Sequence, residues 1–165
     1  MSAERLEVDR IIPAEPHAIF EVLRSPRGHV SIDSSGMLMW AEGDPASKSG
    51  DTFVVHMDRD SLRDFPLDLY DVTVSFTRFE QDRAIEWTIL TEFLNPPLGH
   101  VYGYHLEPTD GGTKVTSYYD WSALADVYRG NIGFPIISET ALRATLGILA
   151  RTVAPGVPRH VSAAD

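Results

Sequence analysis

The C-terminal segment 134–153, FPIISETALRATLGILARTV, is the only long stretch of the chain with clean helical periodicity. One narrow stripe of its helical wheel carries Leu142, Leu146, Leu149 and Val153. A helix with a single apolar stripe needs an apolar surface to pack on. Pro135 suits the first turn, where its missing N–H would have no partner in any case. The segment therefore predicts a long C-terminal helix over 134–153 that the rest of the chain must cover.

Two polar residues, Ser138 and Glu139, interrupt the apolar stripe near the start of this helix. A helix that is apolar at one end of its buried face and polar at the other can close a cavity. In the alternative interpretation, Ser138 caps the helix and Glu139 is solvated. The sequence leaves both interpretations open.

Seven segments ahead of this helix have the pattern of β-strands. In the longest, 67–80, apolar and aromatic side chains alternate with polar ones, as in a strand with one buried face. The predicted strands cover residues 6–12, 36–41, 52–57, 67–80, 84–93, 100–108 and 113–121. Between the first two, short apolar faces bounded by proline predict two short helices, within 13–26 and 27–36.

A run of strands followed by a helix indicates an α+β fold. The turn signal at 109–112, Thr-Asp-Gly-Gly, joins consecutive strands as an antiparallel hairpin. We therefore expect a curved seven-stranded antiparallel sheet, a half-barrel, around the long helix. A chain of 165 residues corresponds to one domain. We assign that domain to residues 1–153 and predict a flexible tail at 154–165, where prolines and a glycine occur.

Composition excludes several classes of function. The chain has 24 acidic and 14 basic residues, a net charge of −10, which argues against a nucleic-acid or anionic-membrane partner. It has no cysteine, so disulfides, thiol catalysis and cysteine–zinc sites are excluded. Its N-terminus has no apolar signal-peptide core, and no apolar run approaches about 18 residues, the length needed to span a membrane. We expect a cytoplasmic protein without membrane insertion.

The sequence also lacks the common motifs for metals and cofactors. The histidines, at positions 17, 29, 56, 100, 105 and 160, form neither HxxxH nor HExxH. There is no GxGxxG, no Walker A sequence and no GxSxG. We therefore expect neither a metal site nor a cofactor.

Several local segments resemble one known superfamily. They are HVSIDSSG (29–36), SGDTFVVHM (49–57), DRAIEW (82–87), YHLEPTDGGTKVTSYYDWS (104–122) and GFP (133–135). With the order of elements over 5–153, they resemble a bacterial branch of the helix-grip superfamily (SRPBCC), which includes START-like and polyketide cyclase-dehydrase-like proteins. One departure is Tyr102, where many relatives carry tryptophan, and it bears on the volume of the pocket.

The resemblance implies a cavity between the concave face of the sheet and the C-terminal helix. Family members use it for lipids, sterols, polyketides or hormones. The inward-facing positions expected to line it are Phe53, Val55, Met57, Tyr70, Val72, Trp87, Ile89, Tyr102, Tyr104, Tyr119, Trp121, Leu142 and Leu146. An aromatic stripe can also be plain core, but a solid core would favour aliphatic side chains, because buried tyrosine hydroxyls need partners.

Five residues are candidates for acid–base chemistry: Glu139, Asp120, Glu92, His56 and His100. Glu139 is the strongest, since burial on the apolar helix face would raise the pKa of its carboxyl group and make it a usable general acid. The strand parity of Asp120 and His56 points outward. His100 shares the parity of Tyr102, which predicts a place at the pocket mouth.

Three functions remain open. The preferred hypothesis is binding of an apolar or aromatic small molecule, lipid-like or polyketide-like, by a monomer or homodimer. The second is a polyketide cyclase or dehydratase that enolises its substrate through a tyrosine or Glu139 and gains rate by holding the reactive conformer. The third is a protein-interaction module like the chaperone-associated members of the superfamily.

Overall fold

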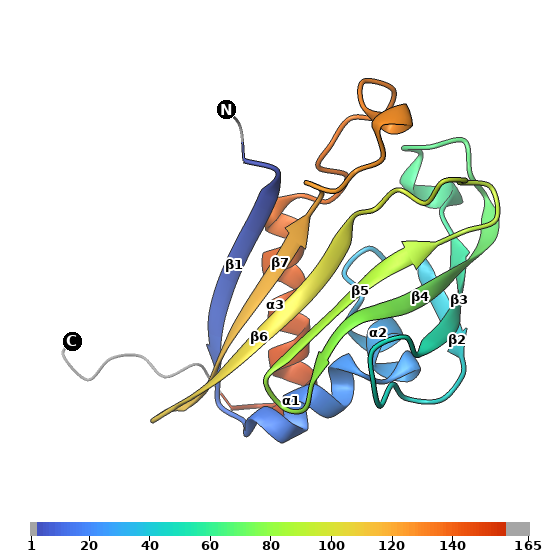
Figure 1. Cartoon of the computed structure of the whole chain (residues 1–165). Helices are drawn as coiled ribbons and strands as arrows, with labels where there is room; N and C mark the ends of the chain where they lie inside the picture. The colour runs from blue at the N-terminus through green and yellow to red at the C-terminus, as the bar shows by residue number, and fades with distance from the viewer. Residues whose placement is uncertain (1–2, 158–165) are drawn as a thin grey trace.

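The computed structural model describes residues 3–157, and within that range the strands form one seven-stranded antiparallel sheet (Figure 1). The strands are β1 (Arg5–Ile12), β2 (Leu38–Glu42), β3 (Thr52–Asp58), β4 (Leu69–Glu80), β5 (Ala84–Leu90), β6 (Val101–Thr109) and β7 (Gly112–Asp120). The helices are α1 (Pro16–Leu23), α2 (Pro26–Ile32) and α3 (Glu139–Val153), with short 3-10 turns η1 (Asp60–Leu62) and η2 (Asp126–Tyr128). The expected α+β architecture, with two short helices after the first strand, is confirmed.

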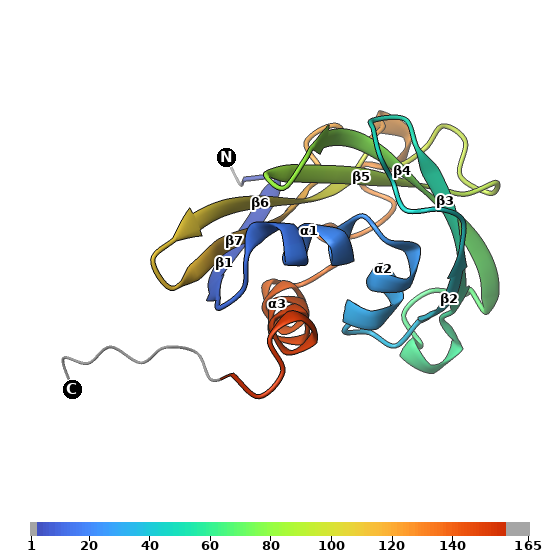
Figure 2. The ribbon, with the colours of Figure 1, turned by 90° about the horizontal axis from the view of Figure 1, so that it is seen from below.

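The strand order is β1-β7-β6-β5-β4-β3-β2, so β1 crosses to pair with β7 and the other strands pair with their chain neighbours. The sheet curves, and all three α-helices lie on its concave side (Figure 2). The hairpin predicted at 109–112 joins β6 to β7. Gly112 enters β7 at φ +135°, and a Cβ there would lie 2.1 Å from the carbonyl oxygen of Ile12. A glycine is required where the hairpin meets the end of β1.

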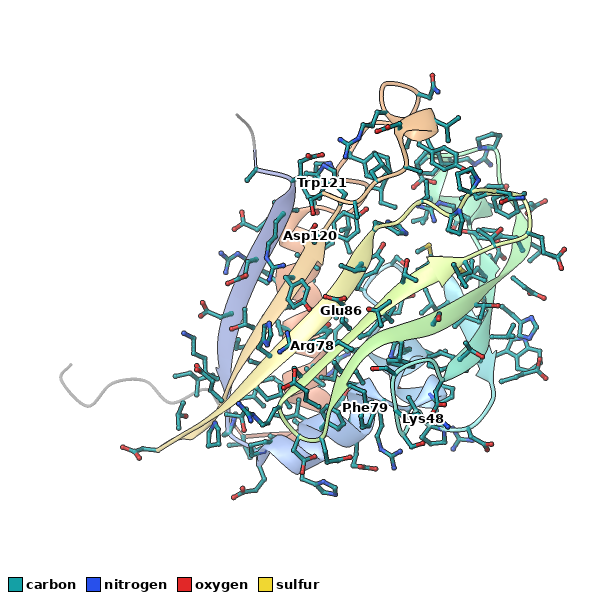
Figure 3. All side chains as sticks on the ribbon, viewed as in Figure 1. Lys48, Arg78, Phe79, Glu86, Asp120 and Trp121 are labelled. Carbon is teal, nitrogen blue, oxygen red and sulfur yellow. The ribbon has the colours of Figure 1, made fainter. Side chains whose placement is uncertain are left out.

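The two faces of the sheet differ in polarity, as the alternation of the strands predicts. The outer face carries charged pairs such as Arg78 and Glu86, which face each other on β4 and β5 (Figure 3). On this face Tyr118 donates a hydrogen bond to Glu86 at 2.6 Å. The inner face carries the buried core, including Val8, Ile12, Phe53, Val74, Phe76 and Val115.

Helix α3 closes part of the concave side. Its buried residues are Leu142, Leu146, Leu149 and Ala150, which confirms the predicted leucine stripe. Full burial of one leucine contributes about 2 kcal/mol. Burial of the stripe therefore contributes more to the stability of α3 than the intrinsic helix propensity of its residues does.

The helix begins at Glu139 and not at 134, so the predicted start was wrong. Ser138 is the N-cap, and its Oγ accepts a hydrogen bond from the Ala141 N–H at 3.1 Å. The Ser138 hydroxyl satisfies one of the unpaired N–H groups of the first turn. Pro135 has no side-chain acceptor and cannot cap a helix in this way. Residues 134–137 form a loop ahead of the helix.

The proposed division into a domain at 1–153 and a tail at 154–165 stays a prediction, because residues 158–165 lie outside the described part of the chain. Within residues 3–157, no helix is long and apolar enough to cross a lipid bilayer.

Candidate ligand-binding cavity

A cavity of about 320 Å³ lies between the concave face of the sheet and helices α2 and α3. Its wall is mostly aliphatic and aromatic. Small-molecule sites in proteins have volumes of roughly 300–1,000 Å³ and are mainly apolar with a few placed polar groups. The cavity is large enough for a two- or three-ring molecule.

Most residues predicted to line the cavity do lie in its wall. They are Val55, Met57, Tyr70, Val72, Trp87, Ile89, Tyr102, Tyr104 and Leu142. Strand parity identified the eight that lie on strands, because side chains two apart on a strand share a face, and the helical period identified Leu142. A ligand-binding role for each of them stays a prediction.

Four predicted lining residues lie in solid core instead: Phe53, Tyr119, Trp121 and Leu146. The ring of Phe53 packs edge-on against His29 of α2, at a centroid distance of 4.9 Å. Trp121 stacks on Tyr119 at 5.5 Å. Leu146 is buried in the contact of α3 with the core. The same concave face thus serves both the core and the cavity, and parity does not separate them.

Much of the remaining wall comes from loops and from α2, which the periodicity analysis did not assign to the cavity. Loops 59–68, 91–100 and 121–138 gather at one end of the sheet (Figure 1). They bring apolar side chains to the cavity: Phe65, Leu67, Phe93, Leu94, Leu98, Ile132, Phe134, Ile136 and Ile137. The detectable signal was the presence of large apolar residues in otherwise polar loops.

Two charged residues lie in the cavity wall, Arg59 and Asp33, and both have partners within the protein. Arg59 donates from Nε and Nη2 to the Asp64 carboxylate at 2.8 and 2.9 Å, and from Nη1 to the Tyr70 hydroxyl at 3.1 Å. Burial lowers the pKa of Arg59, but the bonds to Asp64 and Tyr70 outweigh it and raise the pKa above its usual value. Arg59 therefore stays protonated, and the Asp64 carboxylate balances its positive charge.

Asp33 is engaged just as fully. Its Oδ1 accepts from the N–H and hydroxyl of Ser35 at 3.0 and 2.8 Å, and its Oδ2 accepts from the Leu38 N–H at 3.1 Å. These bonds fix the turn between α2 and β2. The carboxylate within HVSIDSSG thus has a structural role.

His100 directly precedes β6 and is 2% exposed. Its Nδ1 lies 2.7 Å from the hydroxyl of Tyr119. Its Nε2 is buried and has no hydrogen-bond partner among the described residues. Burial lowers the pKa of His100 to about 4, so the ring is neutral at physiological pH. His100 lies in the cavity wall, and its predicted place at the mouth stays a prediction.

A second buried histidine, His29 on α2, lies elsewhere in the wall. Its Nε2 lies 2.7 Å from the carbonyl oxygen of Leu23, which only accepts, so Nε2 carries the hydrogen and donates it. Its ring packs against Trp87 at a centroid distance of 4.4 Å. Burial lowers the pKa of His29 to about 4. Both cavity histidines are therefore neutral.

Aromatic rings from three adjacent strands pack against one another, and those on β5 and β6 line the cavity. Tyr102 on β6 lies opposite Trp87 on β5 and Tyr119 on β7 in the strand register. Trp87 stacks on Tyr104 and Tyr102, at centroid distances of 5.8 and 6.3 Å. Burial raises the pKa of Tyr104 to about 12, although the Ser117 hydroxyl opposes it, and burial also raises the pKa of Tyr102. These phenols are protonated at neutral pH.

Glu139, the strongest acid–base candidate from the sequence, lies outside the cavity. Its side chain is 57% exposed and accepts a hydrogen bond from Arg143 at 3.0 Å. Burial, one of the two interpretations that the sequence left open, is not observed, because an acidic residue in the first turn is favoured by the helix dipole and by a partner four residues on. The solvated alternative is the one observed.

Three of the other acid–base candidates, all except His100, also lie away from the cavity. His56 is on the outer face, within 2.6 Å of Asp71 and 2.8 Å of Glu42, as its parity predicted. Asp120 pairs with Arg5 at 3.2 Å, and Glu92 is exposed. Among residues 3–157, no group of three or more histidine and acidic side chains is arranged to hold a metal ion.

No protein-family model matches the chain, and no curated protein matches it in sequence. Solved structures do match. Protein CV1439 from Chromobacterium violaceum has 12% identity and a TM-score of 0.65, over 92% of this chain and 98% of that one. The Aha1 dimer from Colwellia psychrerythraea has 14% identity and a TM-score of 0.60, over 93% and 98%. An AHSA1-like protein from Aeromonas hydrophila has 16% identity and a TM-score of 0.58, over 96% and 98%.

These likenesses extend over nearly the whole of both chains in each comparison. At such low identities they concern the fold alone. Together with the strand order and the gripped C-terminal helix, they confirm the architecture expected from the sequence. The chain has the helix-grip fold, a curved antiparallel sheet around a long C-terminal helix.

Proposed function

We propose that the protein binds an apolar or aromatic small molecule in the cavity between the sheet and α3. The observation that carries the proposal is the cavity of about 320 Å³ with its mainly apolar and aromatic wall. Transfer of ligand carbon from water into such a site contributes about 25 cal/mol per Å² of apolar surface. Stacked rings such as Trp87 and Tyr104 offer a flat surface to an aromatic or polyketide-like guest.

The protonation states of the wall favour binding over proton transfer. His29 and His100 have pKa values lowered to about 4, which makes each a weak base at neutral pH. The tyrosines have raised pKa values and are weak acids there. Glu139, the acid of the cyclase hypothesis, is solvated outside the wall. Binding is therefore the function that we put forward.

The partner that we propose is a hydrophobic small molecule. The interaction-module hypothesis stays a prediction. One structural neighbour, the Aha1 protein from Colwellia psychrerythraea, is described as a dimer. For this chain, a monomer or a homodimer stays a prediction.

Leu142→Trp tests the proposal, because Leu142 lies in the cavity wall on α3. Binding is followed by the fluorescence of the neutral dye N-phenyl-1-naphthylamine. The matched control is Leu69→Trp, the same change at a leucine that is 76% exposed and outside the wall. We expect at least a tenfold loss of dye affinity in Leu142→Trp and none in the control, with unchanged circular dichroism in both. Equal affinity in the two variants would contradict the proposal.

A further inference from the structure

The hydrogen on His100 can be placed from its one contact. Tyr119 is fully buried, and Nδ1 of His100 is the only hydrogen-bond partner of its hydroxyl among the described residues. A buried hydroxyl is satisfied when it donates its hydrogen. Donation to Nδ1 requires that nitrogen to be the acceptor, so the ring hydrogen of the neutral imidazole is on Nε2. His100 therefore presents an N–H donor from Nε2.

This donor is buried without an acceptor at the cavity. His100 lies in the wall, and its Nε2 has no partner among residues 3–157. Tyr119, which occupies the Nδ1 side of the ring, is not part of the wall. A buried N–H without an acceptor is rare, since its desolvation is not compensated. Neighbouring atoms close off Nε2 in this structure, so an oxygen of a bound molecule would satisfy it after a small movement of the surrounding side chains.

Two further donors lie in the same wall. Tyr70 accepts the Arg59 N–H at 3.1 Å, so its own hydroxyl hydrogen is free to donate. The hydroxyl of Tyr102 has no hydrogen-bond partner within the described range. The Tyr102 ring lies edge-on to His100 at a centroid distance of 5.4 Å. These three groups can each donate a hydrogen bond to an oxygen of a ligand.

The charges of the wall indicate what kind of acceptor fits. Arg59 is bound by Asp64, and both carboxylate oxygens of Asp33 already accept hydrogen bonds. A carboxylate ligand would find no free cation in the described wall, and burial of a charge without a partner is strongly unfavourable. The fitting acceptor is therefore neutral.

We infer that the ligand carries a neutral carbonyl oxygen, as in a ketone, quinone or ester, on its apolar body, and that His100 Nε2–H donates to that oxygen. The inference rests on the proposed function, since it specifies the ligand of the same cavity. The aromatic wall around Trp87 holds the body of the ligand, and His100 with Tyr102 selects its oxygen. An apolar molecule without an acceptor would leave the His100 donor buried and unsatisfied.

Three probes of one shape separate these requirements: 2-acetylnaphthalene, 2-ethylnaphthalene and 2-naphthoate. Their affinities are measured by calorimetry at neutral pH for the wild type and for the double variant His100→Phe/Tyr119→Phe. The double change removes both partners of the hydrogen bond and keeps two aromatic rings, so no buried polar group is left without its partner. The ethyl probe reports whether the cavity of the variant is intact.

We expect the variant to lose about tenfold in affinity for 2-acetylnaphthalene, the net worth of one hydrogen bond. Its affinity for 2-ethylnaphthalene should change less than about twofold, and 2-naphthoate should bind the wild type more weakly than the ketone does. Nitrogen-15 spectra of the wild type, labelled at histidine, test the same point without a substitution. They should show His100 protonated at Nε2, with a shift of that nitrogen on addition of the ketone only.

The outcomes distinguish the two proposals. If no probe binds the wild type, the proposed function fails and this inference fails with it. If both neutral probes bind and the variant loses affinity for both equally, or for neither, the cavity is a binding site but His100 does not donate a hydrogen bond to a carbonyl oxygen. Tightest binding of 2-naphthoate, or a His100 ring protonated at Nδ1, would also overturn the inference while leaving the proposed function in place.

Discussion

Arg59 donates a hydrogen bond from Nη1 to the hydroxyl of Tyr70 at 3.1 Å. This bond connects the loop after β3 to the start of strand β4, where Tyr70 lines the cavity. The same guanidinium holds Asp64 through two further bonds and lies over the ring of Phe65, 5.0 Å from its centroid. One side chain thus organises the loop that carries Phe65 and Leu67 into the wall. The cavity depends on this loop as well as on the sheet.

Arg59→Met should lower the free energy of unfolding by about 1–3 kcal/mol, because the side chain is only 11% exposed and its hydrogen bonds involve charged groups. Urea unfolding measures the loss. Arg78→Met is the matched control, since Arg78 pairs with Glu80 on the exposed outer face. An exposed pair contributes about 0–1 kcal/mol. Equal losses in the two variants would show that Arg59 has no special role in the loop.

Stability should fall as the pH is lowered from about 6.5 to about 4. His29 and His100 have pKa values near 4 in the folded protein against 6.5 for a free histidine. In that window the unfolded chain binds protons that the folded chain does not, so each histidine contributes up to about 1.4 kcal/mol of loss per pH unit. Above pH 6.5 both are neutral in either state, and their contribution is constant.

Chemical denaturation across this pH range measures the slope. The variant His100→Phe/Tyr119→Phe lacks one of the two buried histidines and should show a shallower decline. His56 works in the opposite direction, because its bonds to Glu42 and Asp71 raise its pKa although desolvation opposes them. A variant slope as steep as that of the wild type would contradict the assignment of His100 as a buried neutral group.

Much of this architecture could be predicted because the relevant signals are local. Alternation along β4 and β5 identified Val72 and Trp87 as inward-facing, since parity on a strand depends only on neighbours in the chain. The leucine stripe of α3 followed from the helical period in the same way. The start of α3 was less predictable, because Ser138 as a cap competed with Pro135 as a first-turn residue.

The rest of the cavity could not be predicted from local patterns. Arg59 and Phe93 lie in loops, and the path of a loop is set by the elements that it joins and covers. The separation of Tyr119 in the core from Tyr102 in the wall depends on packing, because both share one face of the sheet. The bond from Tyr119 to His100 likewise requires the register of β6 and β7.

Glu139→Gln should leave ligand binding unchanged. The carboxylate lies at the exposed start of α3, bound to Arg143, and takes no part in the wall. We expect a dye affinity within about twofold of the wild type and a stability change within about 0.5 kcal/mol. A tenfold loss of dye affinity would contradict this prediction and indicate that Glu139 takes part in binding.

Gly112→Ala should destabilise the protein strongly, because the residue has φ +135° and a Cβ would lie 2.1 Å from the Ile12 carbonyl oxygen. The loss should exceed about 2 kcal/mol in urea unfolding. Gly111→Ala is the matched control one residue earlier, where a Cβ would meet nothing within 4 Å. Similar losses for the two glycines would contradict the close contact between the hairpin and β1.

The most direct test of the binding cavity is the set of intermolecular nuclear Overhauser effects between 2-acetylnaphthalene and the methyl groups of the protein. The account predicts contacts to Val72, Ile89 and Leu142, which line the cavity from β4, β5 and α3. It predicts none to Leu69, which lies at the start of β4 and is 76% exposed. Contacts confined to exposed methyl groups, with none to these three, would show that the space between the sheet and α3 does not hold a ligand.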